Sequence, residues 1–117
     1  MLENKLILDS ESKIDLIEIQ KITHITVDAY CCEIYFIEGT KCHSSKALSF
    51  FESSLPDSLF FRINRNTIVN LLHIENVNKL SRKIKIKGDI VLCISARQLK
   101  NLVNLLKQTA ARSKLNA

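Results

Sequence analysis

The sequence predicts a mainly β protein that forms one domain over residues 1–117, with one short internal helix and a C-terminal helix. Three observations lead to this fold class. Most apolar segments are short, rich in β-branched and aromatic residues, and bounded by turn residues. Only two segments repeat apolar residues at the three- and four-residue spacing of a helix. The length of 117 residues suits a single hydrophobic core.

The chain up to residue 43 is predicted to contain strands alone, because apolar runs alternate there with polar turns. The predicted strands are 5–9, 13–19, 22–27, 31–37 and 41–43. Asp28–Tyr30 forms the tip of the hairpin that joins the third and fourth of them. The apolar spacing of Leu48, Phe51 and Leu55 then predicts a short helix, which Ser44 or Ser45 is expected to cap.

The second half is predicted to return to strands before a final helix. Three short strands are expected at 59–62, 68–72 and 74–80. A hairpin then runs from Lys83 to Ile94 and turns at Gly88-Asp89, with one apolar face and one lysine face. Ser95-Ala96-Arg97-Gln98 has the form of a capping box, in which Ser95 caps the helix and Gln98 reaches back. The helix is expected over about 96–110, with a frayed tail over 110–117.

The charge of the chain is divided between its two halves. Residues 1–57 carry 5 Lys or Arg against 10 Asp or Glu, whereas residues 58–117 carry 12 against 2. This asymmetry predicts a polarised surface whose basic side meets a polyanion. On charge alone, a solvated face that keeps the protein soluble is an equal alternative.

Enzymatic and cofactor-binding functions are not expected. The chain has no H-E-x-x-H or G-x-S-x-G motif, and its two glycines do not form a phosphate-binding loop. The four cysteines form no C-x-x-C pair and the three histidines are scattered, so no metal site is expected. Free thiols, together with the lack of a signal peptide or a membrane-spanning run, predict a cytoplasmic protein.

The segment from Phe60 to Asn70, F-F-R-I-N-R-N-T-I-V-N, is unusually rich in planar hydrogen-bond donors. Arg pairs in a bidentate manner with guanine, and Asn does so with adenine. Some of these side chains must face solvent, because burying all of them would leave donors unsatisfied. The alternative is a polar turn with structural asparagines, and Asn70 is assigned such an inward role because its neighbours are apolar.

This segment resembles the LytTR-type DNA-binding domain of bacterial transcriptional regulators, whose pattern is roughly F-x-R-[IV]-[HN]-[RK]-[SN]-x-[IV]-V-N. Ile94-Ser95-Ala96-Arg97 also matches the family's [IV]-S-x-R before its C-terminal helix. The resemblance implies an elongated fold of about ten mostly antiparallel strands. It further implies loops inserted into successive major grooves, bending of the duplex, and binding to short direct repeats with one domain per repeat.

Carried over by position, the resemblance makes Arg65, Asn66 and Arg97 contacts to DNA bases. Asn64, Tyr30 and Cys32 become secondary contacts. Family members often carry a second domain, such as the receiver of a two-component response regulator. A receiver or sensor is therefore a further expected partner, alongside duplex DNA and a second copy on an adjacent repeat. A thiol switch at the adjacent Cys31 and Cys32 is a hypothesis, because they lie near a predicted contact loop.

Lys83, Lys85 and Lys87 share one strand face and are expected to neutralise phosphates, whereas the three base contacts would discriminate sequence. An equally good explanation for the lysines is a charged edge that prevents aggregation. A competing function is a protein-interaction module whose basic face meets an acidic partner. RNA binding is a third alternative, which lacks a paired aromatic stacking platform.

Overall fold

The computed structural model describes residues 4–114, and its fold is mainly β with two α-helices, as the sequence predicts. The strands are β1 (Lys5–Asp9), β2 (Ile14–Glu18), β3 (Ile22–Asp28), β4 (Cys31–Phe36), β5 (Lys41–Ser44), β6 (Phe60–Asn64), β7 (Thr67–Asn70), β8 (Ile74–Asn78), β9 (Lys83–Ile86) and β10 (Ile90–Cys93). The helices are α1 (Leu48–Ser54) and α2 (Ala96–Lys114), and single 3-10 turns precede β3 and β8.

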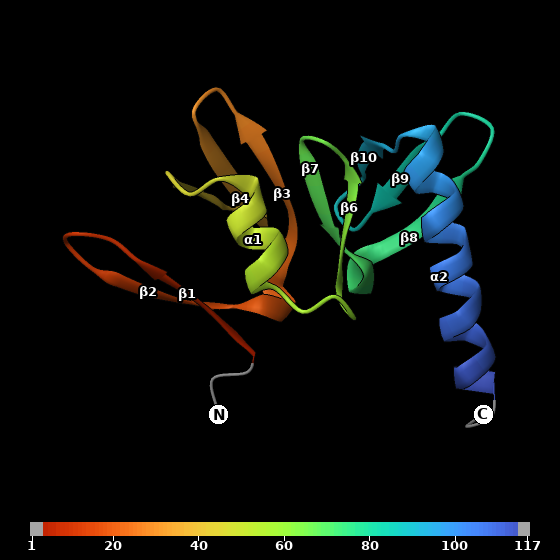
Figure 1. The fold of residues 1–117 in the computed structure, drawn as a ribbon, viewed down its shortest axis with the longest axis horizontal. Coiled ribbons are helices and arrows are strands. Elements are labelled where there is room, and N and C mark those ends of the chain that lie inside the picture. The colour runs from red at the N-terminus through yellow and green to blue at the C-terminus, as the bar shows by residue number, and fades with distance from the viewer. Residues whose placement is uncertain (1–3, 115–117) are drawn as a thin grey trace.

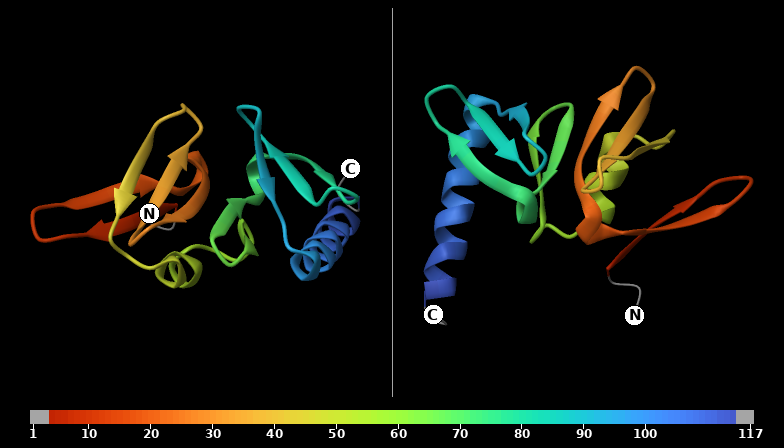
Figure 2. Two further views of the ribbon diagram at one scale, coloured as in Figure 1. Left: turned by 90° about the horizontal axis from the view of Figure 1, so that it is seen from above. Right: turned by 180° about the vertical axis from the view of Figure 1, so that it is seen from behind.

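Three antiparallel sheets follow one another along an elongated molecule of 45 × 33 × 24 Å. The first is the two-stranded ribbon β1-β2. The second has five strands in the order β5-β4-β3-β7-β6, and the third has three in the order β10-β9-β8. The ribbon projects at one end of the molecule and α2 lies along the other (Figure 1), an arrangement that the views from above and behind repeat (Figure 2).

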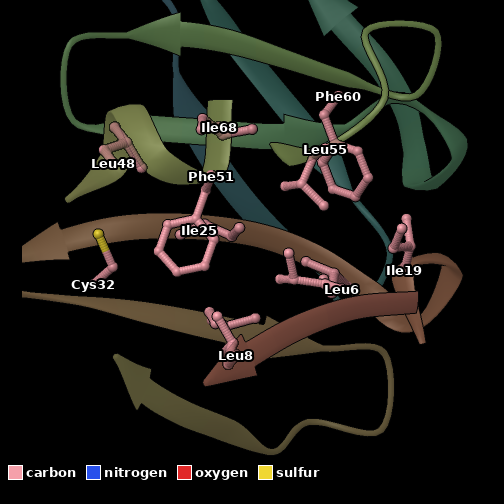
Figure 3. Packing of buried hydrophobic residues seen from close by; sticks show 12 residues of the cluster. Leu6, Leu8, Ile19, Ile25, Cys32, Leu48, Phe51, Leu55, Phe60 and Ile68 are labelled. Atoms are coloured by element: carbon pink, nitrogen blue, oxygen red, sulfur yellow. The ribbon is translucent and has the colours of Figure 1, made fainter. Parts of the chain in front are cut away.

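The first hydrophobic core lies between one face of the five-stranded sheet, α1 and the ribbon. Phe51 of α1 is fully buried at its centre, against Ile25 of β3 and Ile68 of β7 (Figure 3). Leu6 and Leu8 of β1 close the core from the ribbon side. Both residues point the same way because side chains alternate along a strand.

A second core lies on the other side of the sheet, where the three-stranded sheet and α2 pack. Ile84 and Ile86 of β9 are fully buried there, together with Leu102 of α2. Adjacent residues of β7 serve the two cores, since Ile68 belongs to the first and Val69 to the second. The apolar face predicted for the 83–94 hairpin is therefore confirmed.

The two helices begin differently from each other. The residue before α1 is Ala47, which makes no side-chain cap, and the Ser44 hydroxyl instead accepts from the Lys46 amide. The predicted serine cap of α1 is wrong because the helix begins only at Leu48, so that an extended Ala47 and not a serine occupies the cap position. At α2, the Ser95 hydroxyl accepts from the amide of Gln98 at 3.3 Å, as predicted. The Gln98 side chain does not reach back, because it accepts from Asn101.

The C-terminal helix runs to Lys114, beyond the boundary near residue 110 that the sequence predicts. The last three residues of the expected frayed tail, 115–117, lie outside the described residues. Neither α1 nor α2 combines the length and the apolar character needed to cross a membrane.

Candidate nucleic-acid interface

Arg65 and Asn66 form the two-residue turn between β6 and β7. Two-residue hairpin turns usually require residues with positive φ. Neither residue has one, since the non-glycine residues with positive φ in the described chain are Ala29, Arg82 and Asp89. The turn is held instead by the Asn64 side chain, whose Oδ1 accepts from the Asn66 amide at 2.8 Å. A bulge in β6 between Arg62 and Asn64 also adjusts the strand before the turn.

The other end of the Asn64 side chain reaches a segment 29 residues away. Its Nδ2 donates to the Cys93 carbonyl at 2.8 Å, just before α2 begins. A backbone bond runs parallel to it, from the Ser95 amide to the Ile63 carbonyl at 3.0 Å. These two bonds join the Arg65-Asn66 turn to the first turn of α2, which carries Arg97. Asn64 therefore positions its neighbours, and its Oδ1 and its Nδ2 each bond to a protein partner.

The turn and the helix start line one shallow cleft. Its walls are formed by Glu52, Arg62, Asn64, Arg65, Ser95, Arg97 and Gln98. Three of the residues predicted from the sequence as DNA contacts thus come together although they lie as far apart as positions 64 and 97. The side chains of Arg65 and Arg97 are exposed and form no salt bridge within residues 4–109. Their charges are available to a ligand.

Arg62 supports the turn from beneath, a role that the sequence analysis did not assign. Its Nη2 donates to the Arg65 carbonyl at 2.6 Å, and its Nη1 donates to Glu52 at 3.0 Å. The guanidinium thus neutralises the one carboxylate in the cleft. The available sequence signal was its place inside the motif that starts at Phe60. An arginine at this position could contact a ligand or support the turn. Only its hydrogen bonds in the structure distinguish the two roles.

The end of β3, which leads into the β3-β4 hairpin tip, lies beside the turn. The Val27 amide donates to the Asn66 carbonyl at 2.9 Å, which links the last residues of β3 to the β6-β7 turn. Tyr30 follows Ala29, which has a φ of 55°, and its ring is completely exposed. The hairpin tip, the turn and the start of α2 all lie along the upper edge of the molecule in Figure 1. We call Tyr30, Arg65, Asn66 and Arg97 the contact edge.

Cys32 does not belong to this edge. Its side chain is 1% exposed and lies in the first core, so the thiol cannot contact DNA in this conformation. Burial, with a smaller effect of Cys31, raises the pKa of the Cys32 thiol. Its partner in the thiol-switch hypothesis, Cys31, is half-buried and donates to the Asp28 carbonyl. A buried thiol with a raised pKa is a poor redox sensor.

The three predicted phosphate-binding lysines differ in their surroundings. Lys83 lies nearest to the cleft, because its Nζ is 3.1 Å from the sulfur of Cys93, whose carbonyl holds Asn64. Lys85 lies between two carboxylates, 4.0 Å from Glu75 and 3.5 Å from Asp89. Lys87 is exposed. The lysine face predicted from the sequence is thus present, but its middle charge is already partly compensated.

Two further polar groups are structural and lie away from the contact edge. Asn70 is fully buried and bridges the Ile22 carbonyl and the Leu72 amide, each at 2.9 Å, which is the inward role expected for it. His24 is also buried, where its ring stacks on Tyr35 and accepts from or donates to the Thr23 hydroxyl. Burial lowers the pKa of His24 to about 4.

Glu33 forms the centre of a polar cluster on the outer surface of β4 and β5. Lys41 lies 2.9 Å from its carboxylate, the Tyr35 hydroxyl 2.7 Å and His43 3.0 Å. The hydrogen bond from Lys41, followed by that from Tyr35, lowers the pKa of Glu33 to about 2. Both carboxylate oxygens of Glu33 thus bond to side chains of its own sheet.

Comparison with known proteins identifies the class to which this fold and cleft belong. The family model described as the LytTr DNA-binding domain matches residues 12–107, and the chain therefore belongs to the LytTR family of DNA-binding domains. A solved domain from Bacillus cereus, the LytTr domain of a protein described as a methyl-accepting/DNA response regulator, has the same fold. The TM-score is 0.74 at 19% identity, over 88% of this chain and 96% of the other. The comparison with curated proteins gives no match.

Proposed function

We propose that this domain binds duplex DNA sequence-specifically in bacterial transcription regulation, through the contact edge. The observation that carries the proposal is the hydrogen-bonded unit at that edge. It fixes the backbone that carries Arg65, Asn66 and Arg97, which lie on separate segments of the chain. Base discrimination is stronger when the backbone positions of the reading side chains are set before DNA arrives, and bonded supports on a rigid scaffold provide this.

Each group of the edge has a role that follows from its chemistry. Arg65 and Asn66 enter a major groove and pair with base edges. Arg97 lies in the first turn of α2, where free amides and the helix dipole also attract a phosphate. The exposed Tyr30 ring contacts the neighbouring groove or its backbone. Lys83 and Lys87 add affinity that is independent of sequence, because they neutralise phosphates.

Contact with two successive grooves depends on the shape of the duplex. Successive turns of B-DNA are about 34 Å apart, and the contact edge occupies only part of the 45 Å long axis, because the ribbon β1-β2 forms one end of that axis (Figure 1). Filling two grooves with one rigid edge requires the duplex to bend toward it. We infer that the natural site is a pair of short direct repeats with one domain on each. A receiver or sensor would then control access to this site.

Selection from a random duplex library at near-physiological salt tests this function. The wild type should enrich one motif of short repeats, and the Arg65→Ala/Arg97→Ala double variant should not. Each single variant should lose about 1–3 kcal/mol on the selected site and little on random DNA. Equal losses on both would show that the arginines are not base readers. Failure of the folded wild type to enrich any motif would favour the acidic-partner alternative.

A further inference from the structure

The ribbon β1-β2 is apolar on both of its faces, but only one face is covered. Leu6 and Leu8 enter the first core, whereas Ile7, Ile14 and Leu16 point away from it and are 43%, 62% and 57% exposed. Ile7 and Leu16 are direct cross-strand partners, and Ile14 is paired with Asp9 two positions further on. These three side chains therefore form a continuous patch, which we call the ribbon face.

An apolar groove lies at the opposite end of the molecule, between β8 and α2. Five apolar side chains line it, namely Leu71, Ile74, Val77, Val103 and Leu106. Lys79 and Lys107 flank them. The ribbon projects from one end of the long axis and the β8-α2 pair forms the other, so one copy cannot bring the two together (Figure 1). We call this site the end groove.

The charges of the two surfaces are complementary. Asp9 and Glu11, at the turn end of the ribbon, are exposed and form no salt bridge with any described residue. Lys79 and Lys107 beside the end groove are likewise exposed and unpaired in the part of the chain that the structure describes. The only carboxylate of the groove, Glu75, already faces Lys85. The ribbon face is therefore apolar with acidic neighbours and the end groove apolar with basic neighbours, so the two surfaces are complementary in charge.

We propose that the ribbon face of one copy docks into the end groove of a second copy. Because the two surfaces differ and lie at opposite ends, the contact is heterologous, and each copy keeps one unused surface. Exposed apolar patches of this kind mark interaction sites. The ribbon of one copy faces the end groove of the next when two copies follow one another in the same direction. Direct repeats impose that arrangement under the proposed function, but the docking itself needs no DNA.

Complementary variants test the contact in the absence of DNA. Ile14→Lys/Leu16→Lys blocks the ribbon face at two exposed positions, and Val103→Glu/Lys107→Glu blocks the end groove. Sedimentation velocity should show that the wild type associates as its concentration rises, whereas each blocked variant alone remains monomeric. An equimolar mixture of the two variants should form a dimer and nothing larger, since each retains the surface that the other lacks. Val91→Lys, at a residue 57% exposed on β10, is the matched control and should associate like the wild type.

Three results would overturn the proposal. The first is a wild type that remains monomeric up to about 1 mM, because a contact with a weaker dissociation constant would be too weak to matter here. The second is association that neither blocked variant reduces at least tenfold. The third is a mixture that remains monomeric although the wild type associates, because the ribbon face and the end groove would then not bind each other. If Val103→Glu/Lys107→Glu does not fold, Lys79→Glu/Lys107→Glu replaces it. Any of these failures would leave single-site DNA binding, and with it the proposed function, unaffected.

Discussion

At the scale of single residues, both polar ends of the Asn64 side chain are occupied by protein partners. The sequence motif places this residue among the DNA contacts, and the structure gives it a positioning role instead. The reason is that its second partner, the Cys93 carbonyl, lies 29 positions away in the chain. No local pattern predicts such a bond. Asn70, in contrast, has apolar neighbours on both sides, and its inward role could be predicted from them.

Asn64→Ala should weaken binding to the selected site about tenfold, which corresponds to about 1.4 kcal/mol. The side chain touches no DNA in this account, and the loss comes from a turn and a helix start that no longer hold Arg65 and Arg97 in place. Affinity for random duplex should be unchanged. Fluorescence anisotropy on both duplexes measures the difference. Asn78→Ala is the control, because its Oδ1 also caps a turn, through the amides of Leu80 and Ser81. Equal effects of the two variants would count against the positioning role.

His24 and Glu33 should make the stability depend on pH in two separate windows. The pKa of His24 is about 4 in the folded protein, below its ordinary 6.5. The unfolded chain therefore gains a proton first, and the free energy of unfolding falls as the pH drops from 6.5 to 4, by up to about 3 kcal/mol. The pKa of Glu33 is about 2, below its ordinary 4.5, so its stabilisation is lost as the pH drops from 4.5 toward 2.

Urea unfolding at a series of pH values separates the two groups. His24→Asn should flatten the profile between pH 6.5 and 4 and leave the lower window in place. Glu33→Gln should have the opposite effect. If the free energy of unfolding of His24→Asn keeps the full wild-type dependence on pH above 4.5, that dependence comes from other groups.

At the scale of secondary-structure elements, the strands and their turns follow the sequence closely, because each strand has its own apolar pattern and turn residues. The helix starts follow it less well. Two serines before α1 predict a cap, yet the chain enters the helix from an extended Ala47. At α2 the cap is present but Gln98 bonds to Asn101. A serine or glutamine near a helix start can form a cap, but the backbone path determines whether its side chain does so.

Ser95→Ala should therefore destabilise the domain by about 0.5–2 kcal/mol, the usual cost of losing an N-cap. Gln98→Ala should change the free energy of unfolding by less than about 0.5 kcal/mol, because its side chain does not close the capping box. Chemical denaturation of both variants measures this contrast. If Gln98→Ala lowered the free energy of unfolding as much as Ser95→Ala, the side chain of Gln98 would be closing the capping box after all.

The lysine face of β9 should contribute unequally to DNA affinity. Lys83→Ala should reduce the slope of log affinity against log salt concentration by about 1, the effect of one lost phosphate contact. Lys85→Ala should reduce it much less, since Glu75 and Asp89 already compensate this charge. Titrations on random duplex at several salt concentrations measure both slopes. Equal reductions would mean that DNA displaces the carboxylates from Lys85.

At the scale of the whole molecule, the division of charge along the chain becomes a division in space. The acidic half builds the ribbon and most of the five-stranded sheet, and the basic half builds β6 to β10 and α2. Composition predicts such a polarised surface. It does not predict that the end of β3, from the acidic half, lies beside Asn66, because backbone pairing between β3 and β7 produces that neighbourhood.

The position of the contact edge is the central claim, and amide chemical-shift mapping tests it most directly. A ¹⁵N-labelled domain would be titrated with a duplex that carries a single repeat of the selected site, so that only one copy binds, at a salt concentration that suppresses non-specific binding. The largest changes should fall on Tyr30, Arg65, Asn66 and the first turn of α2, with smaller ones on Lys83. Changes concentrated instead on the ribbon β1-β2, or on the outer strands β4 and β5, would contradict it.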